Sequence, residues 1–201
     1  MDFWRVIEER RSMRNFDAGC DVPPEMVQRI LGAAIRAPSA GNCQPWHFVV
    51  IRSEQTKGLL AEVAYGQWFI ADAPVVIVVC ADPARSAWRY GSRGVQLYCL
   101  QDTAAATEHI LLAATAVGLG ACWVGAFDER AASRALGLPT SLRPVAIVPI
   151  GYPAAHPYRT SRRSLKEVVT FGEWFLDRKR EHGYNSIASA EGVTALECQR
   201  R

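Results

Sequence analysis

Residues 36–48, RAPSAGNCQPWHF, are the stretch of the sequence from which the fold can be inferred most directly. They lie between a segment with the apolar spacing of a helix and a segment rich in β-branched residues. Glycine, proline, serine, asparagine and glutamine crowd into this connection, whereas a plain surface loop needs only one glycine or proline to turn the chain. Two interpretations are open: the loop presents Ser39 as a nucleophile, or its backbone approaches a flat, polar ligand.

The serine interpretation requires a nucleophile elbow, in which a strand leads into a tight turn and a helix leads out. Here the order is reversed, because the helical segment precedes the turn and the strand follows it. Pro38 also stands directly before Ser39. The sequence therefore favours a loop that binds a ligand.

The length and composition are those of a single globular domain. The chain has 201 residues, of which 49% are hydrophobic and 21% charged, enough for one well-buried core. No apolar run approaches the roughly 20 residues of a membrane-spanning helix, and the first residues lack the apolar segment of a signal peptide. We therefore expect a cytoplasmic protein with no membrane partner. The net charge of +3 is too small to indicate a nucleic-acid partner.

The cysteine spacing argues against a metal site. The chain contains no C-x-x-C pair and no H-E-x-x-H motif, the spacings typical of zinc sites. Several cysteines lie within apolar runs, where a thiol behaves as a small hydrophobic residue. We expect no metal and a packing role for these thiols, which are Cys20, Cys43, Cys80, Cys99, Cys122 and Cys198.

Apolar periodicity predicts a mixture of helices and strands, hence an α+β fold with a sheet flanked by helices. The predicted strands cover residues 47–53, 73–82, 121–127 and 143–153. The predicted helices cover 2–11, 21–37, 53–64, 128–139 and a long segment from near Asp102 to Gly118 or Gly120. The run 73–82 is apolar throughout, which is typical of a strand covered on both faces. The helix that starts near Asp102 is apolar nearly all round, so it is either a central buried helix or an interface helix.

Two further motifs have both a structural and a functional interpretation. RRSMR, residues 10–14, combines guanidinium groups with a hydroxyl, which suits phosphate oxygens but is also typical of a solvated basic face. GLGACWVG, residues 118–125, fails as a dinucleotide fingerprint, because Trp123 occupies the third glycine position and the loop follows a helix. Gly125 in the middle of a predicted strand instead indicates close approach by another group.

Four stretches, in this order, resemble the nitroreductase-like family of FMN-dependent oxidoreductases. They are RRSMRNF (10–16), APSAGNCQPWHF (37–48), DTAAATEHILLAATAVGLGACWVGAF (102–127), and LGLP (136–139) with RPVAIVPIGYP (143–153) and RRSLKEVV (162–169). The resemblance covers about residues 3–170. It implies a nitroreductase-like α+β fold with a central, mostly antiparallel sheet flanked by helices, in a domain-intertwined homodimer. We therefore expect an FMN-binding domain over 1–171 and a C-terminal arm or partly disordered tail over 172–201.

The resemblance also implies which residues hold the cofactor. Arg10, Arg11, Ser12 and Arg14 would hold the phosphate and ribityl end of FMN, joined by Arg162 or Arg163. Pro38 and Ser39 would lie against the dimethylbenzene edge of the flavin in the neighbouring subunit. Asn42 and Gln44 would be a polar brace for that loop and the flavin, and Gln67 could reach the polar edge of the ring. Val124 and Gly125 would offer backbone N–H groups near the redox-active nitrogen of the flavin.

The function that the resemblance implies is hydride transfer from NAD(P)H through FMN to a flat acceptor such as a nitroaromatic or a quinone. No side-chain acid or base would be required, because the cofactor carries the chemistry. Two alternatives are a flavin-binding or sensing module without turnover, and a specialised flavin-cleaving, dehalogenating or peptide-oxidising relative. The preference between NADH and NADPH and the physiological acceptor cannot be inferred from the sequence.

Overall fold

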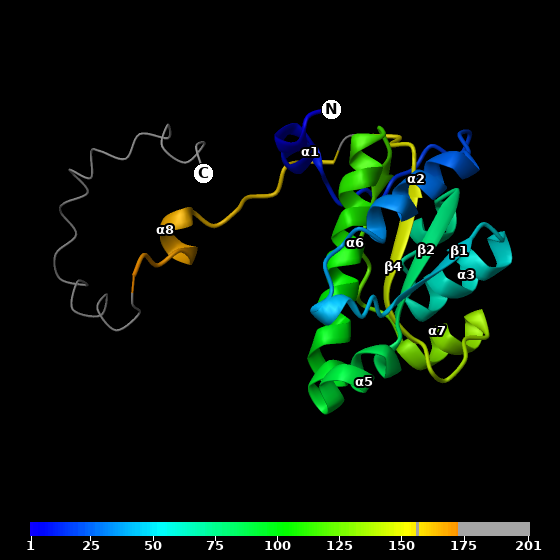
Figure 1. Cartoon of the computed structure of the whole chain (residues 1–201). Helices are drawn as coiled ribbons and strands as arrows, with labels where there is room; N and C mark the ends of the chain where they lie inside the picture. The colour runs from blue at the N-terminus through cyan, green and yellow to red at the C-terminus, as the bar shows by residue number, and fades with distance from the viewer. Residues whose placement is uncertain (156, 173–201) are drawn as a thin grey trace, which may run out of the picture. The chain divides into compact units, whose positions relative to one another are not determined.

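The computed structural model describes residues 1–155 and 157–172 (Figure 1). Its α-helices are α1 (Phe3–Glu9), α2 (Pro24–Ala34), α3 (Glu54–Val63), α4 (Phe69–Asp72), α5 (Pro83–Arg93), α6 (Cys99–Ala116), α7 (Glu129–Leu136) and α8 (Leu165–Val168). A 3₁₀ turn, η1 (Ala40–Asn42), and a π-helical turn, η2 (Gly94–Tyr98), lie between them. The strands are β1 (Trp46–Ile51), β2 (Val75–Ala81), β3 (Gly120–Ala121) and β4 (Arg143–Gly151).

The strands form one antiparallel sheet in the order β1-β2-β4-β3. Every residue of β2 is fully buried, as its continuous apolar run predicts. The α+β class and the antiparallel sheet flanked by helices are therefore confirmed.

The two faces of β2 face two separate parts of the core, because successive side chains of a strand point to opposite sides. Val75, Ile77 and Val79 pack with apolar residues of α2 and α6. Val76, Val78 and Cys80 pack with residues of α3, α4 and α7. The sheet is thus the middle layer between two layers of helices (Figure 1).

The long helix α6 starts earlier than the sequence predicts. It begins at Cys99 rather than near Asp102 and continues from α5 through the π-helical turn η2. Asp102 does not cap this helix; its carboxylate accepts a hydrogen bond from the Ala40 N–H at 3.0 Å. The predicted start near Asp102 is therefore wrong, and Asp102 has a tertiary role.

The predicted strand 121–127 is only partly correct. β3 ends at Ala121, and beyond it only an isolated bridge joins Val124 to Ile147. Between these points the Cys122 N–H donates to the Pro149 carbonyl at 3.2 Å, and Pro149 has no N–H to return the bond. Gly125 therefore lies outside a regular strand, contrary to the prediction.

The chain divides into two units, Met1–Arg159 and Thr160–Arg201, each of which is described by itself. In the second unit, α8 starts at a capping box in which the Ser164 N–H donates to the Glu167 carboxylate at 2.7 Å. The predicted arm or tail, 172–201, lies outside the described residues except for Gly172, and the domain boundary at 171 stays a prediction. Among the described residues, no helix has the length and apolar character to cross a membrane.

Candidate functional site

The segment after α1 joins the sheet and positions the arginine motif. The Met13 N–H donates to the Ala121 carbonyl at 2.9 Å, and Ser12 forms a parallel bridge with Ala121. Burial raises the pKa of the Cys122 thiol, and the Arg14 charge, the Ser12 hydroxyl and the Arg10 charge oppose that shift. Arg10, Ser12 and Arg14 are therefore gathered at the β3 edge of the sheet.

The guanidinium groups at this edge remain largely available to an anion. Arg10 makes one weak ion pair, with 3.8 Å between its Nε and Glu108 Oε1. Arg14 lies over the Phe69 ring at 5.8 Å and forms no ion pair with any described residue. Arg11 instead turns back to the carbonyls of Glu8 and Arg10, at the end of α1.

Gln67 and the 122–127 segment meet at the same edge of the sheet. Gln67 Nε2 donates to the Ala64 carbonyl at 2.9 Å and to the Ala126 carbonyl at 3.1 Å. The Val124 N–H is used within the fold, because it donates to Ile147 at 2.9 Å, whereas Gly125 is exposed. A Cβ added to Gly125 would meet only Trp123 Nε1, at 3.8 Å, so the space beside it is open.

The loop over residues 36–48 has unusual backbone geometry. Gly41, Asn42 and Gln44 have φ angles of 53°, 55° and 50°, in the left-handed region. Gln44 Nε2 donates to Asn42 Oδ1 at 3.1 Å, and the Gln44 N–H donates to Ser39 Oγ at 3.0 Å. The mutual brace of Asn42 and Gln44 is present within the loop, and the Ser39 hydroxyl serves the turn as an acceptor.

Helix α5 fixes the outer side of this loop. Arg89 Nη1 donates to the Gly41 carbonyl at 3.1 Å, and Arg85 Nε donates to the Cys43 carbonyl at 3.0 Å. A Cβ at Gly41 would lie 2.5 Å from the Tyr90 hydroxyl and 2.8 Å from Arg89 Nε, so a larger residue would displace both side chains and would also have to adopt the left-handed backbone. The loop is therefore held against α5 in a single shape.

Asp102 fixes the inner side of the loop from α6. This residue is 6% exposed, and its Oδ2 atom has no hydrogen-bond partner among the described residues. Burial raises the pKa of the Asp102 carboxyl, and the hydrogen bond from the Ala40 N–H opposes the shift. The contact was not predicted, since nothing in the local sequence distinguishes Asp102 from a helix cap.

The predicted site residues form two groups within one chain. Arg10 contacts α6 at Glu108, whereas the loop contacts α6 at Asp102. Six helical residues correspond to about 9 Å along the axis and about 120° around it. Pro38 and Ser39 therefore lie on a different side of α6 from the arginine motif. Arg162 and Arg163 belong to the second unit, so their predicted contact with the phosphate stays a prediction.

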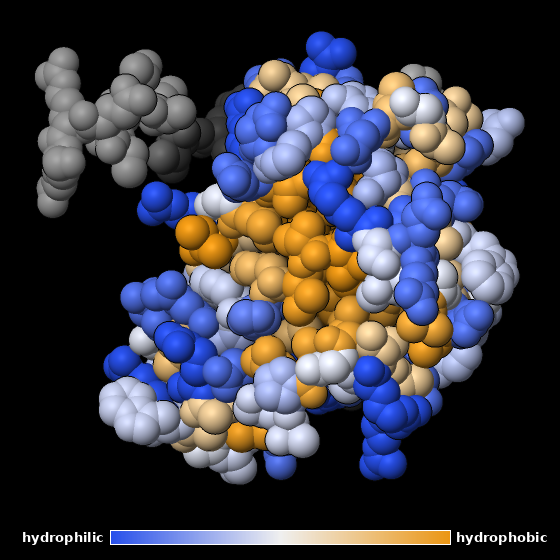
Figure 2. Space-filling model, turned by 90° about the vertical axis from the view of Figure 1, so that its right-hand side faces the viewer, coloured by the Kyte–Doolittle hydropathy of each residue, from blue (hydrophilic) through white to orange (hydrophobic). Residues whose placement is uncertain are grey.

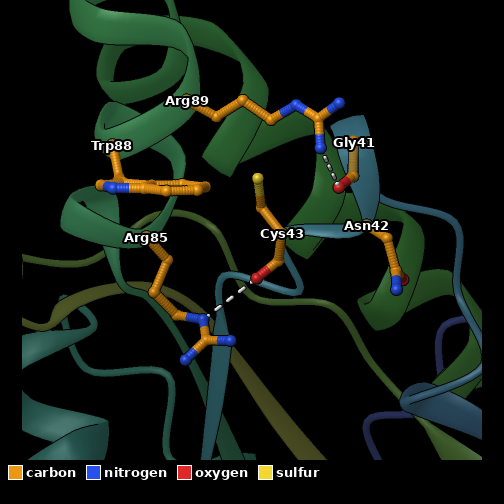
Figure 3. A pocket seen from close by; sticks show the side chains of 6 residues that line it. All are labelled: Gly41, Asn42, Cys43, Arg85, Trp88 and Arg89. Atoms are coloured by element: carbon orange, nitrogen blue, oxygen red, sulfur yellow. Dashed lines mark hydrogen bonds between the residues drawn. The ribbon is translucent and has the colours of Figure 1, made fainter.

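A pocket of about 350 Å³ adjoins the loop on the α5 side (Figure 3). It is lined by Gly41, Asn42, Cys43, Arg85, Trp88 and Arg89. The three α5 residues are absent from the predicted site, because α5 was not predicted as a helix. A motif of two arginines around a tryptophan, four residues apart, is the signal that could have indicated them.

Comparison with known proteins gives a consistent result for the whole first unit. The model of the family described as the Nitroreductase family matches residues 7–72 and 61–152. A Methanothermobacter thermautotrophicus protein provisionally named NADH dehydrogenase/NAD(P)H nitroreductase is 36% identical over 162 residues, covering 78% of this chain and 80% of that protein. The NADH dehydrogenase of Thermus thermophilus is 34% identical, and the match covers 80% of this chain and 91% of that protein.

The solved structures extend this similarity to the fold. A crystal structure from Exiguobacterium sibiricum 255-15, solved in complex with FMN, superposes with a TM-score of 0.78 at 24% identity. The match covers 86% of this chain and 98% of that chain. The expected fold is therefore that of a protein whose crystals contain FMN.

Proposed function

The chain belongs to the nitroreductase family, and from this membership we propose that it is an FMN-dependent oxidoreductase. It takes hydride from NAD(P)H and passes reducing equivalents to a flat acceptor such as a nitroaromatic or a quinone. The two substrates use the same flavin face in turn, so the kinetics are ping-pong. The names of the relatives, NADH dehydrogenase and NAD(P)H nitroreductase, support this reaction class.

One observation carries the assignment: separate segments gather cationic, hydroxyl and open backbone positions at the β3 edge. Arg10, Ser12 and Arg14 supply the donors that a phosphate needs. Gly125 leaves room for a ring, and Gln67 holds the neighbouring Ala126 carbonyl. These residues fit a planar heterocycle with a phosphate tail.

The protein's part in the mechanism is binding and orientation. FMN, when bound, supplies the hydride-transfer chemistry. Arg10 and Arg14 bind its phosphate, with Ser12 as a further donor. The open backbone at Gly125 lets the ring approach without steric conflict, and no side-chain acid or base is needed for the transfer.

The division of the predicted site into two groups supports a homodimer in which each flavin site uses both subunits. The 38–44 loop of one copy would complete the arginine group of the other. The edge strand β1 lies on a face with a contiguous apolar area (Figure 2), and Val50 on this strand is 41% exposed. Apolar surface of this kind is commonly covered by a partner, and we assign a second copy of this chain to that role.

Absorbance spectroscopy tests the proposal directly. The purified protein should be yellow, or become yellow with added FMN, and NADH or NADPH should bleach the flavin band under nitrogen. Protein that stays colourless after incubation with FMN would refute flavin binding. Flavin that binds but is not bleached by either nucleotide would instead indicate a binding module without turnover.

A further inference from the structure

The pocket beside α5 is lined in part by charged and aromatic side chains that have no role in the proposed flavin site. Arg85, Trp88 and Arg89 project from α5 toward the loop at Gly41 and Cys43 (Figure 3). None of these three side chains is needed for the core, because all are exposed. Trp88 is 88% exposed, an unusual position for the largest apolar side chain.

The pocket is cationic and its charges are held in place. No carboxylate among the described residues lies within ion-pair distance of Arg85 or Arg89. Each guanidinium makes one hydrogen bond to a loop carbonyl, and Arg89 also lies over the Tyr90 ring at 5.7 Å. Since a guanidinium has five N–H donors, most of the donors on both residues remain free.

The two charges are also placed where they repel each other. Residues four apart on a helix are neighbours, and like charges there destabilise the helix. Such a pair beside an exposed aromatic ring is the arrangement that binds an anion attached to a flat group: the ring stacks on the tryptophan, and the anion bonds to the guanidinium groups.

We propose that this pocket binds a flat aromatic group that carries a phosphate or carboxylate, as a substrate subsite of the flavoenzyme. The proposal rests on the proposed function, in which two sources of such a group exist. One is the phosphorylated adenosine of the nicotinamide dinucleotide, and the other is an anionic aromatic acceptor. The adenosine is favoured, because a volume of about 350 Å³ suits one nucleotide half rather than the whole dinucleotide.

The position of the pocket fits this assignment. It shares the 36–48 loop with Pro38 and Ser39, the residues predicted to touch the flavin. A dinucleotide with its nicotinamide at the flavin could thus extend its adenosine along the loop toward α5. A 2′-phosphate at this end would add contacts to Arg85 and Arg89, so the enzyme should prefer NADPH to NADH.

Calorimetric titration with adenosine 2′,5′-bisphosphate tests the pocket without turnover. We expect binding by the FMN-loaded protein, weakened about tenfold in the double variant Arg85→Gln/Arg89→Gln through loss of charge-assisted bonds. Trp88→Ala should weaken it, and Trp88→Phe should restore most of it because the flat ring is kept. Arg93→Gln is the matched control, since Arg93 lies on the same helix but bonds to Tyr98 rather than lining the pocket.

Steady-state kinetics distinguishes the two sources. If the adenosine binds here, the ratio of kcat/KM for NADPH to that for NADH falls about tenfold in the double arginine variant, in step with the loss of charge-assisted bonds. If an anionic acceptor binds here, that ratio is constant and the KM for 4-nitrobenzoate rises relative to that for nitrobenzene. Either result supports the subsite.

The proposal is overturned if the double arginine variant and Trp88→Ala both leave bisphosphate affinity, the nucleotide ratio and the acceptor ratio unchanged. The arginines also hold the loop, so two variants separate loss of binding from damage to the loop. Arg85→Lys keeps the charge, and Trp88→Ala removes no hydrogen bond to the loop. If the proposed function fails, the protein binds no FMN, and the same titration on the FMN-free protein then reports on the pocket alone.

Discussion

Asp102 shows how one buried carboxylate can hold the backbone of the loop over residues 36–48. Its Oδ1 atom accepts the Ala40 N–H, and α5 holds the opposite side of the loop through Arg85 and Arg89. The left-handed backbone at Asn42 and Gln44 carries a conformational cost for residues with a Cβ. The tether from Asp102 is one of the contacts that offset this cost.

The first prediction concerns Asp102 and pH. Burial raises its pKa in the folded state above the unfolded value, so the folded state binds this proton more tightly. Between these two pKa values the contribution of Asp102 to stability therefore falls as pH rises. Asp102→Asn keeps an oxygen for the Ala40 N–H and removes the charge. The variant should be at least as stable as the wild type at about pH 7, with the difference shrinking toward about pH 4, near the unfolded pKa of an aspartate.

Thermal melts of both proteins across this range provide the measurement. Asp128 is a control whose contribution to stability changes with pH in the opposite direction, because the hydrogen bond from the Ala131 N–H lowers the pKa of its carboxyl. Its contribution is present above the unfolded pKa and is lost as pH falls through the lowered one. A strong loss of stability in Asp102→Asn near neutral pH would show that the charged form is the one the fold requires.

A second prediction at this scale concerns Arg14. Its guanidinium has no ion-pair partner among the described residues, and the proposed function assigns it to the FMN phosphate. Arg14→Ala should weaken FMN affinity by about 10- to 100-fold, the equivalent of about 1.5–3 kcal/mol for one charge-assisted contact. Fluorescence titration with FMN measures this. Arg29 is an exposed arginine on α2, and Arg29→Ala is the control. Equal FMN affinities in the two variants would show that Arg14 belongs to a solvated basic face and does not contact the phosphate.

At the scale of secondary-structure elements, the sequence correctly predicts helices and strands whose pattern lies in neighbouring residues. The apolar run of β2 is found, and so is the helix predicted over 53–64. Its sequence offers Ser53 or Thr56 as the cap, and the structure has Ser53, whose Oγ accepts from the Thr56 N–H at 3.3 Å. The start of α6 and the extent of the strand after Ala121 were wrong. Asp102 bonds to Ala40 and the Cys122 N–H bonds to the Pro149 carbonyl, and the local sequence reveals neither contact.

The third prediction belongs to the junction of α5 and η2. A Cβ at Gly94 would overlap the Ser86 carbonyl oxygen, a backbone atom, so α5 packs this closely on η2 only because residue 94 is glycine. Gly94→Ala should lower the free energy of unfolding by about 1–3 kcal/mol through overpacking. Gly32→Ala in α2 meets nothing within 4 Å and should be neutral or stabilising. Chemical denaturation compares the two, and equal effects would mean that the junction relaxes freely.

At the scale of the whole molecule, the candidate site could be predicted in part. The arginine motif, Gln67 and the 122–127 segment do meet at one edge of the sheet. The 38–44 loop contacts another side of α6, and Arg162 lies in the second unit. The assignment of Pro38 and Ser39 to the neighbouring subunit came from the family resemblance, because spacing along one chain carries no information about symmetry.

Complementation between subunits tests whether the site is shared. Arg14→Ala weakens FMN binding, and Ser39→Trp should block the loop contact. At FMN concentrations that do not saturate the Arg14→Ala protein, each homodimer should therefore have little activity. If each site takes its arginines from one copy and its loop from the other, a heterodimer of the two variants contains one site with both parts intact. Random assortment makes about half of the dimers heterodimers, so activity should recover to about a quarter of the wild-type value.

Co-expression with two different affinity tags, followed by sequential purification, isolates the heterodimer. Its flavin content and NAD(P)H oxidation are then compared with those of the two homodimers. Recovery requires the loop to act in trans, because a site built within one chain would carry a damaged residue in every copy. A purified heterodimer without activity would show that the loop and the arginines of one chain contribute to the same site. The position of the loop on a different side of α6 would then need another explanation.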